Sequence, residues 1–332
     1  MSAYRYSLGK FIKDWMLIIS MVSGVAAYLI YRSIPALHPA GPVLLSLCKS
    51  IQPMLLFAML FLSFCKIEPR QMRLHRWMGW LLLLQGGLFT ALAFLIASFP
   101  GIQLRYALEA FMLCIICPTA TACAVVTGKL GGNMAGVVTY TVLINLLVSV
   151  LVPLTVPLIH PIEGMSFWKS FLLIISKVFP LLILPCLAAW AVRYLLPGIH
   201  AWFLKYSSAS FSIWAVSLGL AILMSTRAIV HSGGSMWLLL EIAGGSLLAC
   251  ILQFASGRMI GARYGCPVSA GQALGQKNTV FGIWLGYTFL NPVISIAGGF
   301  YSIWHNVFNT WQLYRKRIGK LKGEQTPIAG EP

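Results

Sequence analysis

Apolar runs of about 20 residues recur from one end of this chain to the other, with only short connectors between them. An α-helix of that length spans the hydrocarbon core of a bilayer. Charged residues make up 9% of the 332 residues, against about 25% in soluble globular proteins. We therefore expect an all-α polytopic membrane protein rather than two soluble domains.

The runs predict ten transmembrane helices in one domain over residues 15–314, between a cytoplasmic segment 1–14 and a basic cytoplasmic tail 315–332. The first run follows basic residues but has no small-residue cleavage site, so we interpret it as a retained helix and not a signal peptide. We expect disorder from Arg315 onwards. The expected helices are 15–31, 42–65, 77–98, 107–128, 134–158, 167–196, 203–226, 236–257, 268–287 and 292–314.

Basic residues are distributed unevenly between the two sides of these helices. Seventeen lie on the side of the N-terminus, and four lie on the other side, Arg32, Arg105, Lys169 and Arg227. The positive-inside rule then places both termini in the cytoplasm, in a plasma (inner) membrane protein, and an even number of spans satisfies this. The net charge of +17 thus fits membrane topology and anionic headgroups, and we expect the bilayer but no nucleic acid as a partner.

Two of the expected helices are interrupted by residues that do not suit a helix in lipid. Pro118 and two threonines interrupt the fourth, and the polar run Gly275–Thr279 interrupts the ninth. Each is the fourth helix in a set of five, and an odd set forces the second half to insert inverted, giving repeats of about 15–158 and 167–314. Paired interruptions indicate the midplane site of a transporter, and half-helix N-termini favour anions. The structural alternative is that Pro118 only kinks a packed helix.

At these interruptions the chain resembles the bile acid:sodium symporter family. The matching stretches are C-P-T-A-T-A-C-A at 117–124, G-N-M-A at 132–135, A-L-G-Q-K-N-T at 273–279 and S-I-W-H-N at 302–306. The resemblance implies two inverted repeats of five helices, with a panel of helices one, two, six and seven facing a core of helices three, four, five, eight, nine and ten. Broken helices four and nine would cross in that core. It also implies alternating-access transport of a bile-acid-like or small carboxylate anion.

The chain departs from the family at both sodium sites. The resemblance implies that a shared glutamate is replaced by Ala273, a serine–asparagine pair by Cys123 and Ala124, a serine by Val137, and a glutamine by Lys277. Apolar side chains cannot supply the oxygen ligands that a hard cation needs. We therefore predict a sodium-independent transporter that has no metal or other cofactor, with proton coupling left open. The positions that correspond to the sodium sites are Gln85, Cys123, Ala124, Val137, Thr141, Ala273, Gln276 and Lys277.

Lys277 is the strongest functional candidate, because charges inside a membrane are costly and mark substrate or proton pathways. It is a countercharge for the substrate, a group that releases a proton in the cycle, or a structural cation between the broken helices. The resemblance implies substrate contacts at Thr121 and Asn278, and the free backbone N–H groups of Thr119 and Thr279 can donate beside them. Capping of the broken helices explains such residues equally well. Secondary candidates are His305, Asn306 and Glu241, of which Glu241 is a possible partner for Lys277 or Lys177. We expect Lys49 to snorkel to the interface.

Other classes of protein fit the sequence less well. Asp14 is the one aspartate, which excludes paired-aspartate proteolysis, and no Gly-rich phosphate loop is present for ATP-driven pumping. The eight cysteines are interpreted as small packing residues. The remaining alternatives are a sodium-coupled symporter of the same class, a channel or sensor, and a thiol enzyme that pairs Cys117 or Cys123 with His305.

Overall fold

The computed structural model describes residues 8–207, 209–233, 235–319 and 324. Its described residues are helical, and their one strand-like feature is an isolated bridge between Thr119 and Lys277. Residues 1–7 of the expected cytoplasmic segment and residues 320–323 and 325–332 of the expected tail lie outside the described residues. The all-α architecture is as predicted.

Thirteen α-helices and two short 3-10 helices make up the described residues. The helices of the first half are α1 (Leu8–Ser33), η1 (Pro35–Ala40), α2 (Gly41–Cys65), η2 (Pro69–Gln71), α3 (Arg76–Ser98), α4 (Arg105–Ile116), α5 (Cys123–Leu130) and α6 (Met134–Ile159). Those of the second half are α7 (Phe167–Leu195), α8 (Pro197–Lys205), α9 (Ala209–Ser232), α10 (Met236–Ala262), α11 (Pro267–Gly275), α12 (Thr279–Phe289) and α13 (Ile296–Arg317).

Seven helical segments among the described residues are long and apolar enough to cross a membrane. They are Trp15–Ser33, Pro35–Cys65, Arg76–Ser98, Met134–Ile159, Phe167–Leu195, Ala209–His231 and Met236–Ala262. Two of the other expected spans are divided into α4 with α5 and α11 with α12, so each piece is too short on its own. The third, α13, is 22 residues long and buries polar residues such as Ser302, Asn309 and Gln312. The helices are those of a polytopic membrane protein.

Two expected boundaries were wrong. The helix expected at 203–226 is α9, which begins at Ala209, because Pro197 starts the separate short helix α8 at a position where proline is favourable. This helix continues to Ser232, so Arg227, which was expected in a connector, lies inside α9. The residues from Arg315 to Arg317 were expected to be disordered but continue α13.

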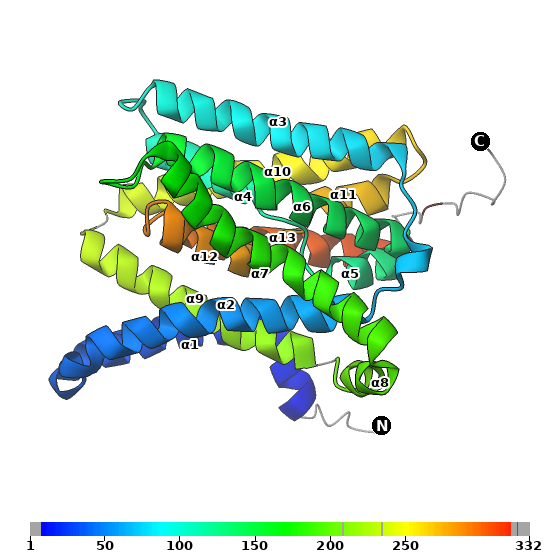
Figure 1. Ribbon diagram of the computed structural model, residues 1–332, viewed down its shortest axis with the longest axis horizontal. Coiled ribbons are helices and arrows are strands. Elements are labelled where there is room, and N and C mark those ends of the chain that lie inside the picture. Colours follow the sequence, from blue (N-terminus) through cyan, green and yellow to red (C-terminus); the bar gives the residue numbers. More distant parts are fainter. Residues whose placement is uncertain (1–7, 208, 234, 320–323, 325–332) are drawn as a thin grey trace.

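The helices pack in two groups that Figure 1 shows one above the other. At the bottom of the view α9 contacts both α1 and α2, and α2 also contacts α7. In the other group α10 contacts α4, α11 and α13, and α3 contacts α4 and α6. The helix α12 contacts α13 in this group and α2 and α9 in the first, and α6 packs on α7. The first residues of α1 and the last of α13 lie toward the same end of the bundle (Figure 1).

Glu324 joins the C-terminal region to the starts of two helices. Its carboxylate accepts hydrogen bonds from the backbone N–H and the hydroxyl of Ser269 in α11, both at 2.6 Å, and from the backbone N–H of Asn133 before α6 at 3.2 Å. The backbone N–H of Glu324 donates to the carbonyl oxygen of Gly131 at 2.9 Å. The free N–H groups at helix starts favour such a carboxylate, so Glu324 caps α6 and α11 together.

Glycines allow α10 to approach α4 closely. A Cβ atom added to Gly245 in α10 would lie 2.2 Å from the carbonyl oxygen of Ala107 in α4, whereas one added to the neighbouring Gly244 would meet no atom within 4 Å. Backbone contact of this kind is typical of membrane helices that pack through small residues. Position 245 therefore sets the distance between these two helices.

We expect Gly245→Ala to lower the thermal unfolding midpoint of the detergent-purified protein by several degrees, because the added methyl group forces the α4 and α10 backbones apart. Overpacking of this kind costs about 1–3 kcal/mol. Differential scanning fluorimetry measures the midpoint. Gly244→Ala is the matched control and should leave it unchanged or raise it slightly; equal midpoints for the two variants would show that the close approach does not matter.

Candidate functional site

Both predicted interruptions are present. The helix α4 ends at Ile116 and α5 starts at Cys123, and α11 ends at Gly275 and α12 starts at Thr279. Pro118 has no backbone N–H to continue α4 and disfavours helical geometry at the residue before it, and Cys117 accordingly has ψ 132°. At the second interruption Gln276 is extended, with φ −92° and ψ 101°. The chain therefore leaves the helix at both places.

The two interrupted segments hydrogen-bond to each other. Thr119 and Lys277 form an antiparallel bridge. On one side of it the backbone N–H of Ala120 donates to the carbonyl oxygen of Gln276 at 2.8 Å, and on the other that of Asn278 donates to the carbonyl oxygen of Pro118 at 2.8 Å. Backbone groups that leave a helix at membrane depth need such partners inside the protein. Each interruption therefore supplies the partners of the other.

Side chains cap the helix ends at this crossing. The Thr119 hydroxyl donates to the carbonyl oxygen of Ala273 at 2.7 Å, and the Tyr301 hydroxyl donates to that of Gly275 at 2.7 Å, so both satisfy the end of α11. Gln85 of α3 donates its amide to the carbonyl oxygen of Cys117 at 3.1 Å, at the end of α4. These carbonyls are among those that a helix C-terminus leaves without a helical partner.

Lys277 lies at the centre of the crossing. Its side chain is 1% exposed, and its Nζ has no hydrogen-bond partner among the described residues. The ionisable side chains near it are those of Cys117, Cys114 and Cys123, and no carboxylate is among them. The C-terminal ends of α4 and α11 both lie at the crossing and carry partial negative charge, which favours a cation there. Lys277 is thus a buried amine without an acidic partner.

Three of the cysteines, which we interpreted only as small packing residues, lie together near the crossing. Cys114 and Cys117 are three residues apart in a Cys-x-x-Cys pattern, and both are buried near Lys277. All eight cysteines are free thiols; seven are buried and Cys48 is half-buried. The described residues contain no group of three or more His, Cys, Asp or Glu side chains that could hold a metal ion. The thiols at the crossing therefore surround Lys277 without forming a metal-binding set.

The five predicted substrate-binding residues lie in or next to the two paired segments of the crossing. They are Thr119, Thr121, Lys277, Asn278 and Thr279. The hydroxyl of Thr279 is hydrogen-bonded to Ser302, and Asn278 accepts the backbone N–H of Phe281 with its side-chain oxygen to cap α12. Thr121, in contrast, is only half-buried. Thr119 and Asn278 therefore cap helix ends, Thr279 is paired with Ser302, and Thr121 is the most accessible of the set.

The positions that correspond to sodium ligands offer few free oxygen atoms. The Thr141 hydroxyl donates to the carbonyl oxygen of Val137, and Cys123 is hydrogen-bonded to Thr127. The side-chain oxygen of Gln85 accepts from Tyr140, whereas that of Gln276 has no partner among the described residues. The remaining positions carry apolar side chains, and they are Ala124, Val137 and Ala273.

The secondary candidates are not assembled into one site. His305 is buried against Tyr301, with ring centroids 5.6 Å apart, and its Nδ1 has no partner in the described structure. Asn306 donates its amide to the carbonyl oxygen of Ser302. Glu241 is half-buried, and no ion pair within the described residues joins it to Lys277 or Lys177. A direct ion pair of Glu241 with either lysine is therefore not formed among the described residues.

A cavity of about 670 Å³ lies between α2, α7, α9 and the half-helix α12. Sequence reasoning missed it. Lys49, which we expected to snorkel to the interface, is exposed and lines this cavity. Its Nζ lies 5.8 Å from the ring centroid of Tyr287. The sequence feature that could have indicated the cavity is the pair of lysines at positions 49 and 177, which interrupt apolar segments. The polar lining is Lys49, Gln52, Ser176, Lys177, Tyr287 and Thr288.

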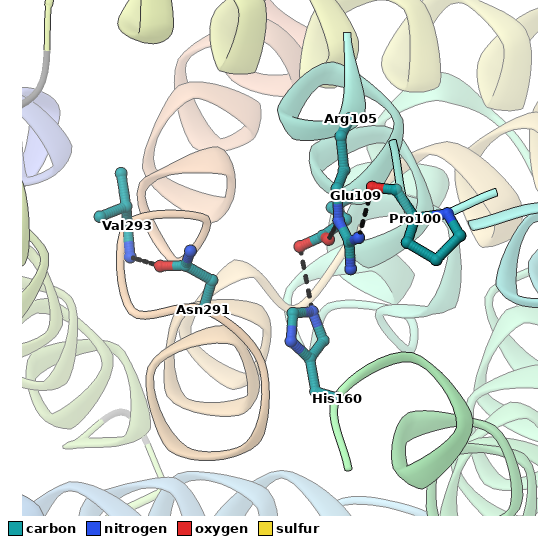
Figure 2. A network of polar contacts seen from close by, with 6 residues as sticks. All are labelled: Pro100, Arg105, Glu109, His160, Asn291 and Val293. Carbon is teal, nitrogen blue, oxygen red and sulfur yellow. Dashed lines mark hydrogen bonds and ion pairs between the residues drawn. The ribbon is translucent and has the colours of Figure 1, made fainter. Parts of the chain in front are cut away.

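A polar network near the start of α4 was also missed. The buried Glu109 accepts from Arg105 at 2.7 Å and from the His160 ring at 3.1 Å, and Arg105 also donates to the carbonyl oxygen of Pro100 (Figure 2). His160 follows α6, so the network ties that end of α6 to α4. Asn291, which accepts the backbone N–H of Val293, lies in a separate loop in the same view (Figure 2). The sequence alone does not link these residues, since Glu109 and His160 are 51 positions apart.

Comparison with known proteins gives no identification: no family model matches the chain, and no curated protein does either.

We expect Lys277→Met to raise the thermal unfolding midpoint, because methionine fills a similar volume and removes a buried amine that lacks hydrogen-bond partners. A buried unsatisfied polar group costs about 1–3 kcal/mol, and more when charged. Lys129→Met, at an exposed position of α5, is the control and should have little effect. A midpoint clearly below that of the wild-type protein would show that Lys277 holds the crossing together.

Proposed function

We propose that this protein is a transporter that carries a small organic anion across the plasma (inner) membrane by alternating access, without sodium. The observation that carries the proposal is the crossing of two interrupted helices around the buried, unpaired amine of Lys277. An intramembrane lysine without an acidic partner is costly, and it is retained where a substrate or ion requires it. Capping of two packed helices needs no such charge.

The half-helices add to this attraction for an anion. The starts of α5 and α12 lie at the two interruptions, so their free N–H groups and positive dipole ends face the crossing. The helix α12 then continues from Thr279 to the cavity, which it lines with Ile283, Trp284 and Tyr287. A ligand in the cavity therefore lies against the same half-helix that begins beside Lys277.

The proposed topology has ten crossings in two inverted repeats. In this arrangement α4 with α5 makes the fourth crossing, α11 with α12 the ninth and α13 the tenth. The panel consists of α1, α2, α7 and α9, and the core consists of α3 to α6 and α10 to α13. Both termini face the cytoplasm. The helix packing supports this division, because α9 contacts α1 and α2, and α2 contacts α7. The helices α2, α7 and α9 line the cavity together with α12 of the core.

Lys277 would take the place of a bound sodium ion. Where the related family has a shared glutamate and a glutamine, this chain has Ala273 and Lys277, so one carboxylate and one mobile cation are exchanged for one fixed cation. The convergence of the α4 and α11 C-terminal ends supports this role, since it gives a cation a favourable field without a carboxylate. Transport would then proceed without a sodium gradient.

We expect at least one anion from a panel of bile acids, steroid sulfates and small carboxylates to raise the unfolding midpoint in sodium-free buffer, with no further rise on adding sodium. That anion should show saturable counterflow in proteoliposomes, and Lys277→Met should abolish it. Choline replaces sodium in the control buffer. Uptake that requires sodium would favour the sodium-coupled symporter, and unsaturable flux or current would favour a channel.

We expect the double variant Ala273→Glu/Lys277→Gln to gain sodium dependence, because it restores the carboxylate and amide that the resemblance implies for sodium binding. The measurement is counterflow of the same anion with sodium or choline outside. Each single variant is a control: Lys277→Gln alone should be inactive in both salts, and Ala273→Glu alone should pair its carboxylate with Lys277. Activity of the double variant that is equal in both salts would contradict the replacement of sodium by Lys277.

A further inference from the structure

The cavity between α2, α7, α9 and α12 contains two cationic side chains and no acidic one. Lys49 comes from α2 and Lys177 from α7, and the lining includes neither aspartate nor glutamate. No ion pair within the described residues involves either lysine. The contact that Lys49 does make, with the Tyr287 ring at 5.8 Å, is worth about 0.5–1 kcal/mol at an accessible site. Both ammonium groups are therefore available to a ligand.

The cavity wall also carries hydrogen-bond acceptors without partners. Gln52 is buried, donates its amide to Ser217, and leaves its side-chain oxygen without a partner in the described residues. Pro53 and Pro180 lie inside α2 and α7, so the carbonyl groups of Lys49 and Ser176, four residues earlier, lose their helical donors. A lipid acyl chain would leave all these groups unsatisfied, so the wall suits a polar ligand.

The size and the remaining walls exclude a simple inorganic ion as the intended ligand. A volume of about 670 Å³ is in the range of sites for organic molecules of drug size. Apolar side chains, including Phe57, Leu181 and Trp284, line the space between the polar groups. The ligand therefore has an apolar or aromatic body in addition to its charge.

We propose that this cavity selects organic dianions, with one anionic group held by Lys49 and the other by Lys177. The inference rests on the proposed function for its place in transport, and on the cavity alone for binding. A dianion neutralises both lysines, whereas a monoanion leaves one ammonium group without a counter-ion in a cavity that has no carboxylate. The two lysines are thus specificity-determining residues that act apart from Lys277 at the crossing.

The test compares two probes of the same shape, 1,5-naphthalenedisulfonate and 1-naphthalenesulfonate, which stay fully ionised at every working pH. Isothermal titration of the detergent-purified full chain gives a dissociation constant for each. We expect the disulfonate to bind at least about tenfold more tightly, a difference of about 1.4 kcal/mol. Lys49→Gln and Lys177→Gln should each reduce that preference to less than about threefold and change binding of the monosulfonate less.

Lys169→Gln is the matched control, because it removes the same charge from the exposed first turn of α7, outside the cavity lining. It should keep the full preference. Equal binding of the two probes, binding of neither at millimolar concentration, or a preference that survives Lys49→Gln and Lys177→Gln would each overturn the proposal.

Transport is measured separately, so the two proposals can fail independently. Lysine-dependent disulfonate binding without counterflow of the disulfonate or of any panel anion would leave the dianion site standing and refute the transporter. Saturable counterflow of a monoanion, with no preference for the disulfonate in binding, would support the transporter and refute the dianion site.

Discussion

The pairing of two short backbone segments across the middle of the molecule is the constraint on which the other features depend. Pro118 to Ala120 and Gln276 to Asn278 each lack helical partners, and each segment would be unstable at membrane depth without the other. Because the pairing is antiparallel, it places the end of α4 beside the start of α12 and the end of α11 beside the start of α5, so all four helix ends lie at the crossing. The crossing thus creates both the place for a cation and the field that attracts an anion.

The sequence predicted the all-helical class and the two interruptions, because proline chemistry and polar residues in an apolar run act locally. It also identified Lys277 as an unusual intramembrane charge. It did not predict the cavity or the cluster of Glu109 with Arg105 and His160, because these depend on which helices become neighbours. Lys49 illustrates the difference: its position along α2 is compatible with snorkelling, and only the packing of α12 beside α2 makes it part of a cavity wall.

Two charged regions of different character are connected by one short helix. Lys277 is enclosed by protein at the start of α12, whereas Lys49 and Lys177 line a cavity against later turns of the same helix. A displacement of α12 would change the surroundings of both regions at once. The contact between Lys49 and Tyr287 joins the cavity-lining parts of α2 and α12. In the proposed transporter, α12 is therefore the element that would couple ligand occupancy to the crossing.

Cys48 gives this arrangement a built-in reporter position. Seven of the eight thiols are buried and Cys48 is half-buried, directly before Lys49 in α2. A maleimide-linked fluorophore or nitroxide can thus attach selectively to the native chain, without first replacing the other cysteines. Its emission or spectral line shape would then follow the environment of α2 next to the cavity-lining Lys49 while the protein works.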